Sequence, residues 1–309
     1  MNSKSPLYLP KSPGESRSIV DADERADSRL AKILGVSVRE AQRVLKSRSL
    51  LINGVWRTLK KGDRLSVKAT IEVPDYQSPG KQRPIANKKA LPLILAKGKG
   101  WIAVDKPAGT PVHPLKPGEN DTLLNGLISA YPDLSGIGES GLRSGVVHRL
   151  DVGTSGVIIF ATVESVYRKL RSSFSRHRVE KYYFAVVDGL PKPTGEIELS
   201  LYVAQHSPAR VRVAPKTSTR RTWPCDLSWR VIRRSGKHSL VEVRIWTGFL
   251  HQIRVGLSHM GFPVIGDPIY GKGKLSDRLM LHSGRIRLEE EGIDVQSPYP
   301  VTWPNLKLK

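Results

Sequence analysis

The sequence predicts an α+β protein: a mixed, largely antiparallel sheet flanked by helices, preceded by a small domain of two helices and short strands. Three observations lead to this prediction. Helix-like and strand-like segments follow one another without the regular alternation of a parallel βαβ array. A segment rich in proline, glycine and lysine, residues 74–92, divides the chain. Hydrophobic residues make up 39% of the 309 residues, which is enough for a core in each part.

This division gives four predicted regions. Residues 1–20 are rich in serine, proline and lysine and are predicted to be a flexible tail. Residues 21–73 form the small domain, residues 74–92 a linker, and residues 93–309 the larger domain. Lys and Arg outnumber Asp and Glu in both domains, most densely in the first 90 residues.

Two short helices are predicted in the small domain. Leu30, Ile33 and Leu34 share one helical face. Ser37 stands three residues before Glu40, the spacing of a capping box that begins a second helix.

Strands follow these helices. Two strand-like runs flank Asn53-Gly54, a pair that favours the tight turn of a β-hairpin. Gly62-Asp63 predicts another turn before the last strands of the domain.

The second helix also carries a basic face. Arg39, Arg43 and Lys46 recur at a spacing of three to four residues and share one side, and we expect them to be unmatched by acids. A charged helix face is often only solvated. Unpaired cations favour the other interpretation, a surface that binds RNA.

In the larger domain, β-prone runs at Trp101–Val104, Lys181–Val187 and Val241–Ile245 predict strands. An apolar stripe from Val163 to Phe174 predicts one helix. Another stripe from Ile253 to Met260 predicts a helix that carries His251, Gln252 and Arg254 near its start.

Bulk properties indicate a polyanionic partner. The formal net charge is +22, and such an excess of cations is typical of proteins that bind nucleic acid phosphates, although it may also reflect a generally basic set of proteins. Cys225 is the only cysteine, which excludes an intrachain disulfide and a thiolate zinc finger. No apolar run is long enough to cross a membrane and the first residues lack an apolar leader, so we expect a cytoplasmic protein.

One carboxylate stands in a polar block directly before a buried strand. The block reads His148-Arg149-Leu150-Asp151-Val152-Gly153-Thr154-Ser155-Gly156, and the apolar run Val157–Ala161 follows. Taken alone, Asp151 could simply brace a turn. A carboxylate that stays ionised in a closed cleft needs a fixed cation beside it, and Arg254 offers one.

Further basic and aromatic residues accompany this block. Five cations crowd the helix after the buried strand and are candidates for phosphate contacts or for a solvated face: Arg168, Lys169, Arg171, Arg176 and Arg178. A second basic stretch is predicted to be a loop over the substrate: Arg210, Arg212, Lys216, Arg220 and Arg221. Trp223 and Trp229 are expected in the core, with a stacking platform as the alternative.

Several blocks in one order resemble a known family, the RluA-type pseudouridine synthases. They are His148–Asp151 with Thr154–Gly156, Val104–Gly109 with Val112–Pro114, Glu180–Tyr183, His251–Arg254, Gly261–Gly271 and Leu281-His282. They extend over about residues 95–290. Residues 24–73 resemble the alpha-L RNA-binding domain of a small-subunit ribosomal protein, a domain that often precedes the catalytic domain in this family.

The resemblance implies isomerisation of uridine in RNA to pseudouridine, on a nucleotide flipped out of its stack. It implies that Asp151 is the catalytic aspartate, either as nucleophile at C1′ or as base at C2′. Tyr183 would pack under the base and help to remove the C5 proton, and Arg254 would pair with Asp151. Arg149, His148 and Thr154 would lie at the substrate, whereas Tyr182 lies outside the site. No ATP, metal or organic cofactor is implied, in agreement with the lack of a P-loop, a Rossmann fingerprint or a metal-ligand spacing.

The resemblance also indicates which RNA is modified. The alpha-L domain favours structured ribosomal RNA, most of all of the large subunit, with transfer RNA as the alternative. The segment before Arg254 departs from the family pattern, because Phe249 and Leu250 replace an arginine and a threonine. The alternatives are an RNA-binding protein that keeps the fold without catalysis and, with less support, a glycoside hydrolase that uses two carboxylates.

Overall fold

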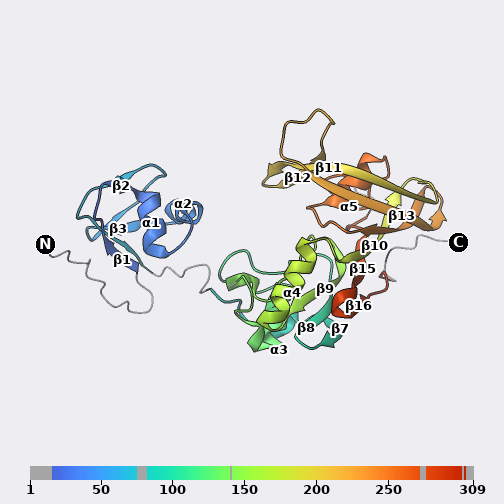
Figure 1. Ribbon diagram of the computed structural model, residues 1–309, viewed down its shortest axis with the longest axis horizontal. Helices are drawn as coiled ribbons and strands as arrows, with labels where there is room; N and C mark the ends of the chain where they lie inside the picture. The colour runs from blue at the N-terminus through green and yellow to red at the C-terminus, as the bar shows by residue number, and fades with distance from the viewer. Residues whose placement is uncertain (1–15, 75–81, 140, 272–275, 301–302, 304–309) are drawn as a thin grey trace. The chain divides into compact units, whose positions relative to one another are not determined.

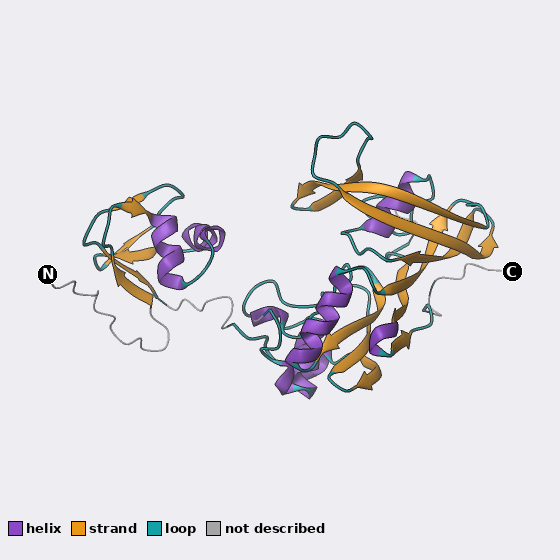
Figure 2. Ribbon diagram, in the orientation of Figure 1, coloured by secondary structure: helices purple, strands orange, loops and turns teal. Residues whose placement is uncertain are grey.

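The structure is a computed structural model that describes residues 16–74, 82–139, 141–271, 276–300 and 303. It divides into two compact units, residues 1–82 and residues 83–309 (Figure 1). Helices and strands are mixed in both units, so the predicted α+β class is confirmed (Figure 2). No helix in the described ranges is long and apolar enough to cross a membrane.

The first unit joins two helices to a small sheet. The sheet has the order β1-β6-β3-β4, and a separate pair joins β2 to β5. The elements are β1 (Ser16–Ile19), β2 (Glu24–Arg25), α1 (Ala26–Leu34), α2 (Val38–Ser47), β3 (Leu50–Ile52), β4 (Val55–Arg57), β5 (Arg64–Leu65) and β6 (Thr70–Val73).

Local signals of the first unit are confirmed. The Ser37 hydroxyl accepts a hydrogen bond from the Glu40 amide and begins α2 at the predicted position. Asn53 and Gly54 both have positive φ, 52° and 76°, as the hairpin turn between β3 and β4 requires. The N-terminal tail is shorter than predicted, because residues 16–19 form β1 and pair with β6. The rest of that tail, residues 1–15, lies outside the described residues.

The linker also differs from the prediction. Residues 75–81 lie outside the described residues, but the last part of the predicted linker belongs to the second unit. The Asn125 side chain donates to the Ile85 carbonyl (2.6 Å), and the Asn87 amide donates to the Asn125 carbonyl (2.9 Å). Proline and lysine content alone could not reveal these bonds, because their partners lie about 40 residues further along the chain.

The second unit is built on a ten-stranded sheet of order β12-β11-β13-β14-β10-β15-β9-β8-β7, with β16 beside β15. Only the pair β9–β15 is parallel among the described strand pairs, which confirms a mixed, largely antiparallel sheet. The strands are β7 (Leu93–Gly98), β8 (Trp101–Lys106), β9 (Ser155–Ala161), β10 (Glu180–Asp188), β11 (Thr194–His206), β12 (Ala209–Val213), β13 (Trp223–Ser235), β14 (His238–Ile245), β15 (Leu281–Leu288) and β16 (Ile293–Gln296). The helices are α3 (Leu123–Ala130), α4 (Glu164–Ser175) and α5 (Gln252–His259), with short 3-10 turns at Lys88–Ala90, Pro132–Leu134, Gly141–Arg143 and Glu289–Glu291.

Strand β9 is covered on both faces, as its continuous apolar sequence predicts. Val157 and Ile159 pack with Leu170 of α4, whereas Ile158 and Phe160 pack with Leu124 of α3. Every residue of the strand is buried. This rigid strand fixes the loop that precedes it.

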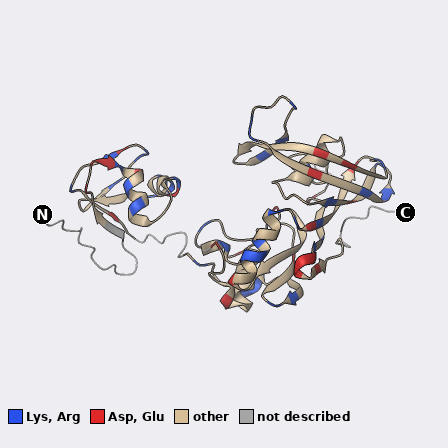
Figure 3. Cartoon of the chain, in the orientation of Figure 1, with Lys and Arg blue, Asp and Glu red and all other residues tan. Residues whose placement is uncertain are grey.

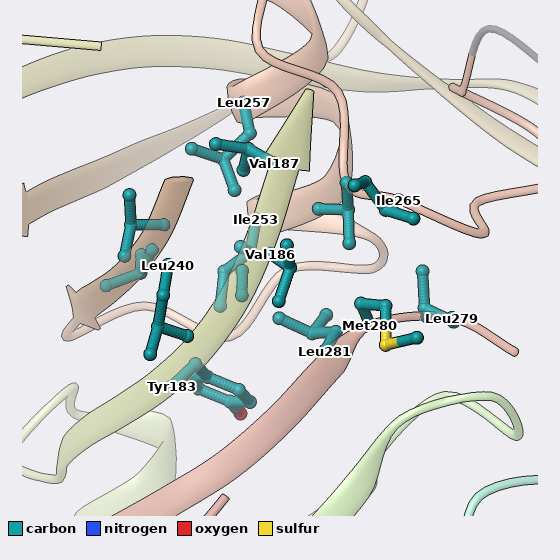
Figure 4. Close-up of a cluster of buried hydrophobic side chains, with 14 of the residues drawn as sticks. Tyr183, Val186, Val187, Leu240, Ile253, Leu257, Ile265, Leu279, Met280 and Leu281 are labelled. Carbon is teal, nitrogen blue, oxygen red and sulfur yellow. The ribbon is translucent and has the colours of Figure 1, made fainter. Parts of the chain in front are cut away.

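A second core lies where α5 covers strands β10, β14 and β15. Ile253 and Leu257 of the helix pack against Val186 and Val187 of β10 and Leu240 of β14 (Figure 4). Tyr183 lies at one end of this cluster (Figure 4). The predicted helix begins one residue later than expected, at Gln252, because His251 has a positive φ of 55°.

The second basic stretch was predicted to be a loop, and this is wrong for its first part. Arg210 and Arg212 belong to β12, which pairs with β11 at the edge of the sheet. Val211 is buried between them, so the segment alternates like a half-buried strand.

Candidate functional site

A cleft of about 1730 Å³ opens in the second unit and collects the residues that the sequence singled out. Asp151, Tyr183 and Arg254 all line it. They come from the loop before β9, from β10 and from the first turn of α5. Residues far apart in the sequence thus meet at one site, as predicted.

The backbone around Asp151 is held on both sides. The Thr154 amide donates to the Asp151 carbonyl (3.0 Å) and closes a tight turn. The Val152 carbonyl accepts from the Gly109 amide (2.8 Å) and from the Lys106 ammonium (3.0 Å). The carboxylate is therefore carried by a fixed loop.

Gly156 allows this loop to enter the sheet. Its φ is +109°, and a Cβ at this position would lie 2.2 Å from the Ser283 carbonyl oxygen. Ser283 is its parallel partner on β15. Only glycine combines this backbone conformation with this close approach.

Lys106 is fully buried beneath the Asp151 loop. Its ammonium group also donates to the carbonyls of Pro107 (3.0 Å) and Thr110 (2.6 Å). Burial lowers the pKa of Lys106 to about 8, although the nearby Asp151 charge acts in the opposite direction. This buried cation ties two loops of the cleft together.

Arg254 links two carboxylates. Its Nη1 donates to Asp151 Oδ2 (2.8 Å), while Nε and Nη2 donate to the two oxygens of Asp267 (2.8 and 2.9 Å). Burial lowers the pKa of Arg254, but the hydrogen bonds and charges of Asp267 and Asp151 outweigh burial and raise it. The guanidinium is therefore a permanent cation beside Asp151.

Asp267 anchors this arginine from below. It is buried, and its Oδ1 also accepts from the amides of Ile269 (2.9 Å) and Tyr270 (3.0 Å). Burial raises the pKa of Asp267, but these donors and Arg254 outweigh it, and the pKa is lowered. Asp267 is an ionised counterion for Arg254.

His251 also lies close to the central carboxylate. Its Nε2 is 3.8 Å from Asp151 Oδ2, and its Nδ1 hydrogen-bonds the Tyr270 hydroxyl (2.9 Å). Burial lowers the pKa of His251, more than the Asp151 charge raises it. The imidazole is thus neutral at pH 7 and leaves charge compensation to Arg254.

Tyr183 presents its ring to the cleft from β10. Burial, together with the Asp151 charge, raises the pKa of its phenol well above the usual value, so the hydroxyl stays protonated. Successive side chains of a strand point to opposite faces. Tyr182 accordingly points away and donates to Glu180 Oε2 (2.5 Å), as expected for a residue outside the site.

The three predicted substrate contacts of the polar block differ in accessibility. Arg149 is exposed at the cleft. Thr154 is buried. His148 stacks on Phe174, with ring centroids 4.5 Å apart, and its Nε2 accepts from the Ile159 amide (2.9 Å). Burial lowers the pKa of His148 to about 3, so this neutral ring braces the loop against β9.

The predicted basic face of the first unit is exposed on α2, apart from the cleft in the second unit: Arg39, Arg43 and Lys46. The expectation that acids do not match these cations is wrong for Arg43, which pairs with Glu40 (2.8 Å). Glu40 lies one helical turn away, where the capping pattern had placed it for another reason.

Most cations near α4 are likewise paired (Figure 3). Arg168 pairs with Glu164, Arg171 with Glu139 and Arg178 with Glu290; Lys169 and Arg176 are exposed. Trp223, expected in the core, lines the cleft and is only half-buried. Trp229 packs partly buried against the core.

Sequence reasoning gave no role to Asp267, His251 or Lys106. Asp267 and His251 stood inside recognised blocks, and the need of a buried arginine for counterions was the available signal. Lys106 bonds only backbone carbonyls, which leave no trace in a sequence.

Comparison with known proteins agrees with this geometry. Residues 100–259 match the family described as RNA pseudouridylate synthase. The chain is 38% identical over 199 residues to an uncharacterized RNA pseudouridine synthase of Chloroflexus aurantiacus, covering 64% of this chain and 60% of that protein. It is 35% identical over 204 residues to the ribosomal large subunit pseudouridine synthase D of Zymomonas mobilis, covering 65% and 63%. It thus spans less than two thirds of the length of these two relatives.

A longer match and a solved structure complete the comparison. An uncharacterized RNA pseudouridine synthase of Mycobacterium bovis is 32% identical over 294 residues, covering 90% of this chain and 92% of that protein. The structure of human RNA pseudouridylate synthase domain containing 1 has a similar fold, with a TM-score of 0.57 at 22% identity over 69% of this chain and 85% of that chain. The chain belongs to the RNA pseudouridylate synthase family.

Proposed function

We propose that the protein isomerises specific uridines in RNA to pseudouridines, with Asp151 as the catalytic carboxylate. The observation that carries this proposal is the Asp151–Arg254–Asp267 chain, in which one carboxylate lines the cleft on a fully anchored arginine. The protein's own residues supply an anion, a cation and a neutral phenol at one point.

The reaction conserves all atoms. The bond from C1′ to N1 breaks, the uracil turns, and a bond from C5 to C1′ forms. C5 gives up its proton and N1 ends with one. Such a rearrangement needs a group that stabilises or traps the sugar while the base turns, and a carboxylate can do either.

Asp151 has two routes to this end. As a nucleophile it attacks C1′, and as a base it removes the proton from C2′. Arg254 contacts Oδ2, while the described residues offer no hydrogen bond to Oδ1. We assign the reacting role to Oδ1. Uridine deuterated at C2′ separates the routes, because only proton removal gives a primary isotope effect.

Tyr183 supports the turning base in this proposal. Its raised pKa leaves little phenolate at neutral pH. A neutral ring suits packing against the uracil better than it suits direct removal of the C5 proton.

Large-subunit ribosomal RNA is the proposed substrate. The support is a relative named ribosomal large subunit pseudouridine synthase D and the exposed cations of α2 in the first unit. Transfer RNA is the alternative, and the two are compared directly by offering unmodified transcripts of each.

The test is Asp151→Asn. This variant should release no tritium from RNA labelled at C5 of uridine, because the carboxylate is absent, while its affinity for the same RNA stays within about threefold. Asp133→Asn, which changes an exposed carboxylate of the same unit, is the matched control and should keep full activity. Tritium release by Asp151→Asn at the wild-type rate would refute the role of Asp151. Absence of release by the wild-type protein, with RNA still bound, would favour an RNA-binding protein without catalysis.

A further inference from the structure

Two aromatic rings are stacked on the wall of the cleft. Trp223, the first residue of β13, and Phe249, in the loop before α5, have ring centroids 4.8 Å apart and planes inclined by 26°. Both residues line the cleft and both are half-buried. The pair therefore remains accessible from the cleft.

A cation covers the indole. The Arg221 guanidinium lies 5.1 Å from the Trp223 ring centroid and is exposed. Within the described part of the chain this contact is its only partner. A guanidinium held by face contact alone is easily displaced by a stronger stacking group.

The stack is anchored beside the catalytic carboxylate. The Phe249 amide donates to Oε1 of Gln252 (3.0 Å), a buried side chain that also donates to the Asp226 carbonyl (2.6 Å). His251, two residues after Phe249, approaches Asp151 to 3.8 Å. The loop that carries Phe249 is thus fixed at both ends of this short segment.

Core packing explains only part of this arrangement. Phe249 does contact a buried cluster that includes Leu199 and Cys225. Covering that cluster requires neither the near-parallel Trp223 ring nor the guanidinium above it. A layered arrangement of two rings and an arginine is the kind of surface on which bases of single-stranded RNA stack.

We propose that the Trp223–Phe249 stack binds an unpaired nucleobase next to the target uridine, with the base displacing Arg221 from the indole. The proposal rests on the proposed function, since it places this base in the same cleft. A purine should bind better than a pyrimidine because its larger ring system overlaps more of the indole. Displaced Arg221 then remains close enough to meet the adjoining phosphate.

Binding of a defined probe tests this site without any catalysis. The probe is a single-stranded RNA of nine nucleotides with one central uridine between adenosines, and with either neighbour replaced by an abasic residue. The abasic change at the stacked position should weaken binding to the wild-type protein by about tenfold, the usual contribution of one base on an aromatic ring. Trp223→Leu and Phe249→Leu should bind the intact RNA about tenfold more weakly and lose this discrimination.

Trp229→Leu is the matched control. Trp229 lies on the same strand and is half-buried, but its indole donates to the Lys192 carbonyl (3.2 Å). This variant should discriminate between the two RNAs as the wild-type protein does. Discrimination that persists in Trp223→Leu, or is absent from the wild-type protein, would overturn the proposal.

A second measurement needs only the wild-type protein. With 2-aminopurine next to the uridine, stacking on the indole should quench the fluorescence of the analogue more strongly than binding of an RNA that carries it at the far end. Equal fluorescence at both positions would speak against the stack. Failure of tritium release with intact base discrimination would count against the proposed isomerisation alone, so the two proposals fail separately.

Discussion

Asp267→Asn should destabilise the protein more than Asp151→Asn, although Asp151 is the proposed catalytic group. Asp267 is completely buried and receives two bonds from Arg254, whereas the Asp151 side chain is 23% exposed and receives one. Breaking a buried pair leaves an uncompensated charge and costs about 3–5 kcal/mol. Arg254 keeps Asp151 in the first variant, so we expect the lower end, about 3 kcal/mol.

The corresponding loss for Asp151→Asn is about 1 kcal/mol, because a partly exposed charged hydrogen bond is lost and Asp267 still neutralises the arginine. For a domain of this size each kcal/mol lowers the melting temperature by about 2–4 °C. Asp267→Asn should therefore melt about 6–12 °C below the wild-type protein, and Asp151→Asn within about 4 °C of it.

Activity should follow the opposite order. Asp267 positions Arg254 without touching the substrate, so its replacement should lower kcat by about 10- to 100-fold, the usual effect of removing such a support. Asp151→Asn should leave no measurable tritium release. The two assays are thermal unfolding and tritium release on the same samples. Equal stabilities of the two variants, or a larger loss for Asp151→Asn, would show that Asp267 does not carry the arginine as argued.

Three other predictions concern pH, the sheet and the first unit. The lowered pKa of Asp267 contributes stability that is present above its unfolded value near 3.8 and is lost as the pH falls through the folded value, so from about pH 4 downward the wild-type protein should lose more unfolding free energy than Asp267→Asn; parallel denaturant curves at each pH would refute this. Gly156→Ala should prevent stable folding, as seen by soluble yield and melting, whereas Gly118→Ala, with φ +90° and open space around its Cβ, should cost only about 1 kcal/mol. Similar losses would contradict the close contact with Ser283. Removing all three cations of the α2 face should reduce the slope of log affinity against log salt by about two, measured by RNA binding titrations, and an unchanged slope would exclude this face from the RNA: Arg39, Arg43 and Lys46.

Local patterns predicted the elements around the site well. The apolar run of β9 and the Asn53-Gly54 turn depend on neighbours in sequence, so periodicity and turn chemistry were sufficient. The pairing of Asp151 with Arg254 followed from charge and from the family resemblance. The α+β class followed from the order of elements.

The remaining features depend on contacts between distant segments. Lys106 is buried against carbonyls, and a fully buried lysine is rare enough that no pattern would place it there. Strand β12 did leave a signal, because Arg210 and Arg212 alternate with Val211 and Val213, but the positive charge favoured a loop instead. Trp223 was expected inside the core because burial of an aromatic residue is the commoner outcome, and only the stacking on Phe249 reveals its place at the cleft.

The geometry of Arg254 explains how a counterion can sit beside a reactive carboxylate without consuming it. A guanidinium that gripped Asp151 through two bonds would occupy both carboxylate oxygens. Asp267 takes the Nε and Nη2 edge instead, which leaves Nη1 alone to reach Asp151 Oδ2. Oδ2 fixes the orientation and Oδ1 is left for the sugar. Lysine could supply the charge but not this division of donors, because its ammonium group has no rigid fork. The second, buried aspartate is therefore part of what makes the first one a usable nucleophile or base.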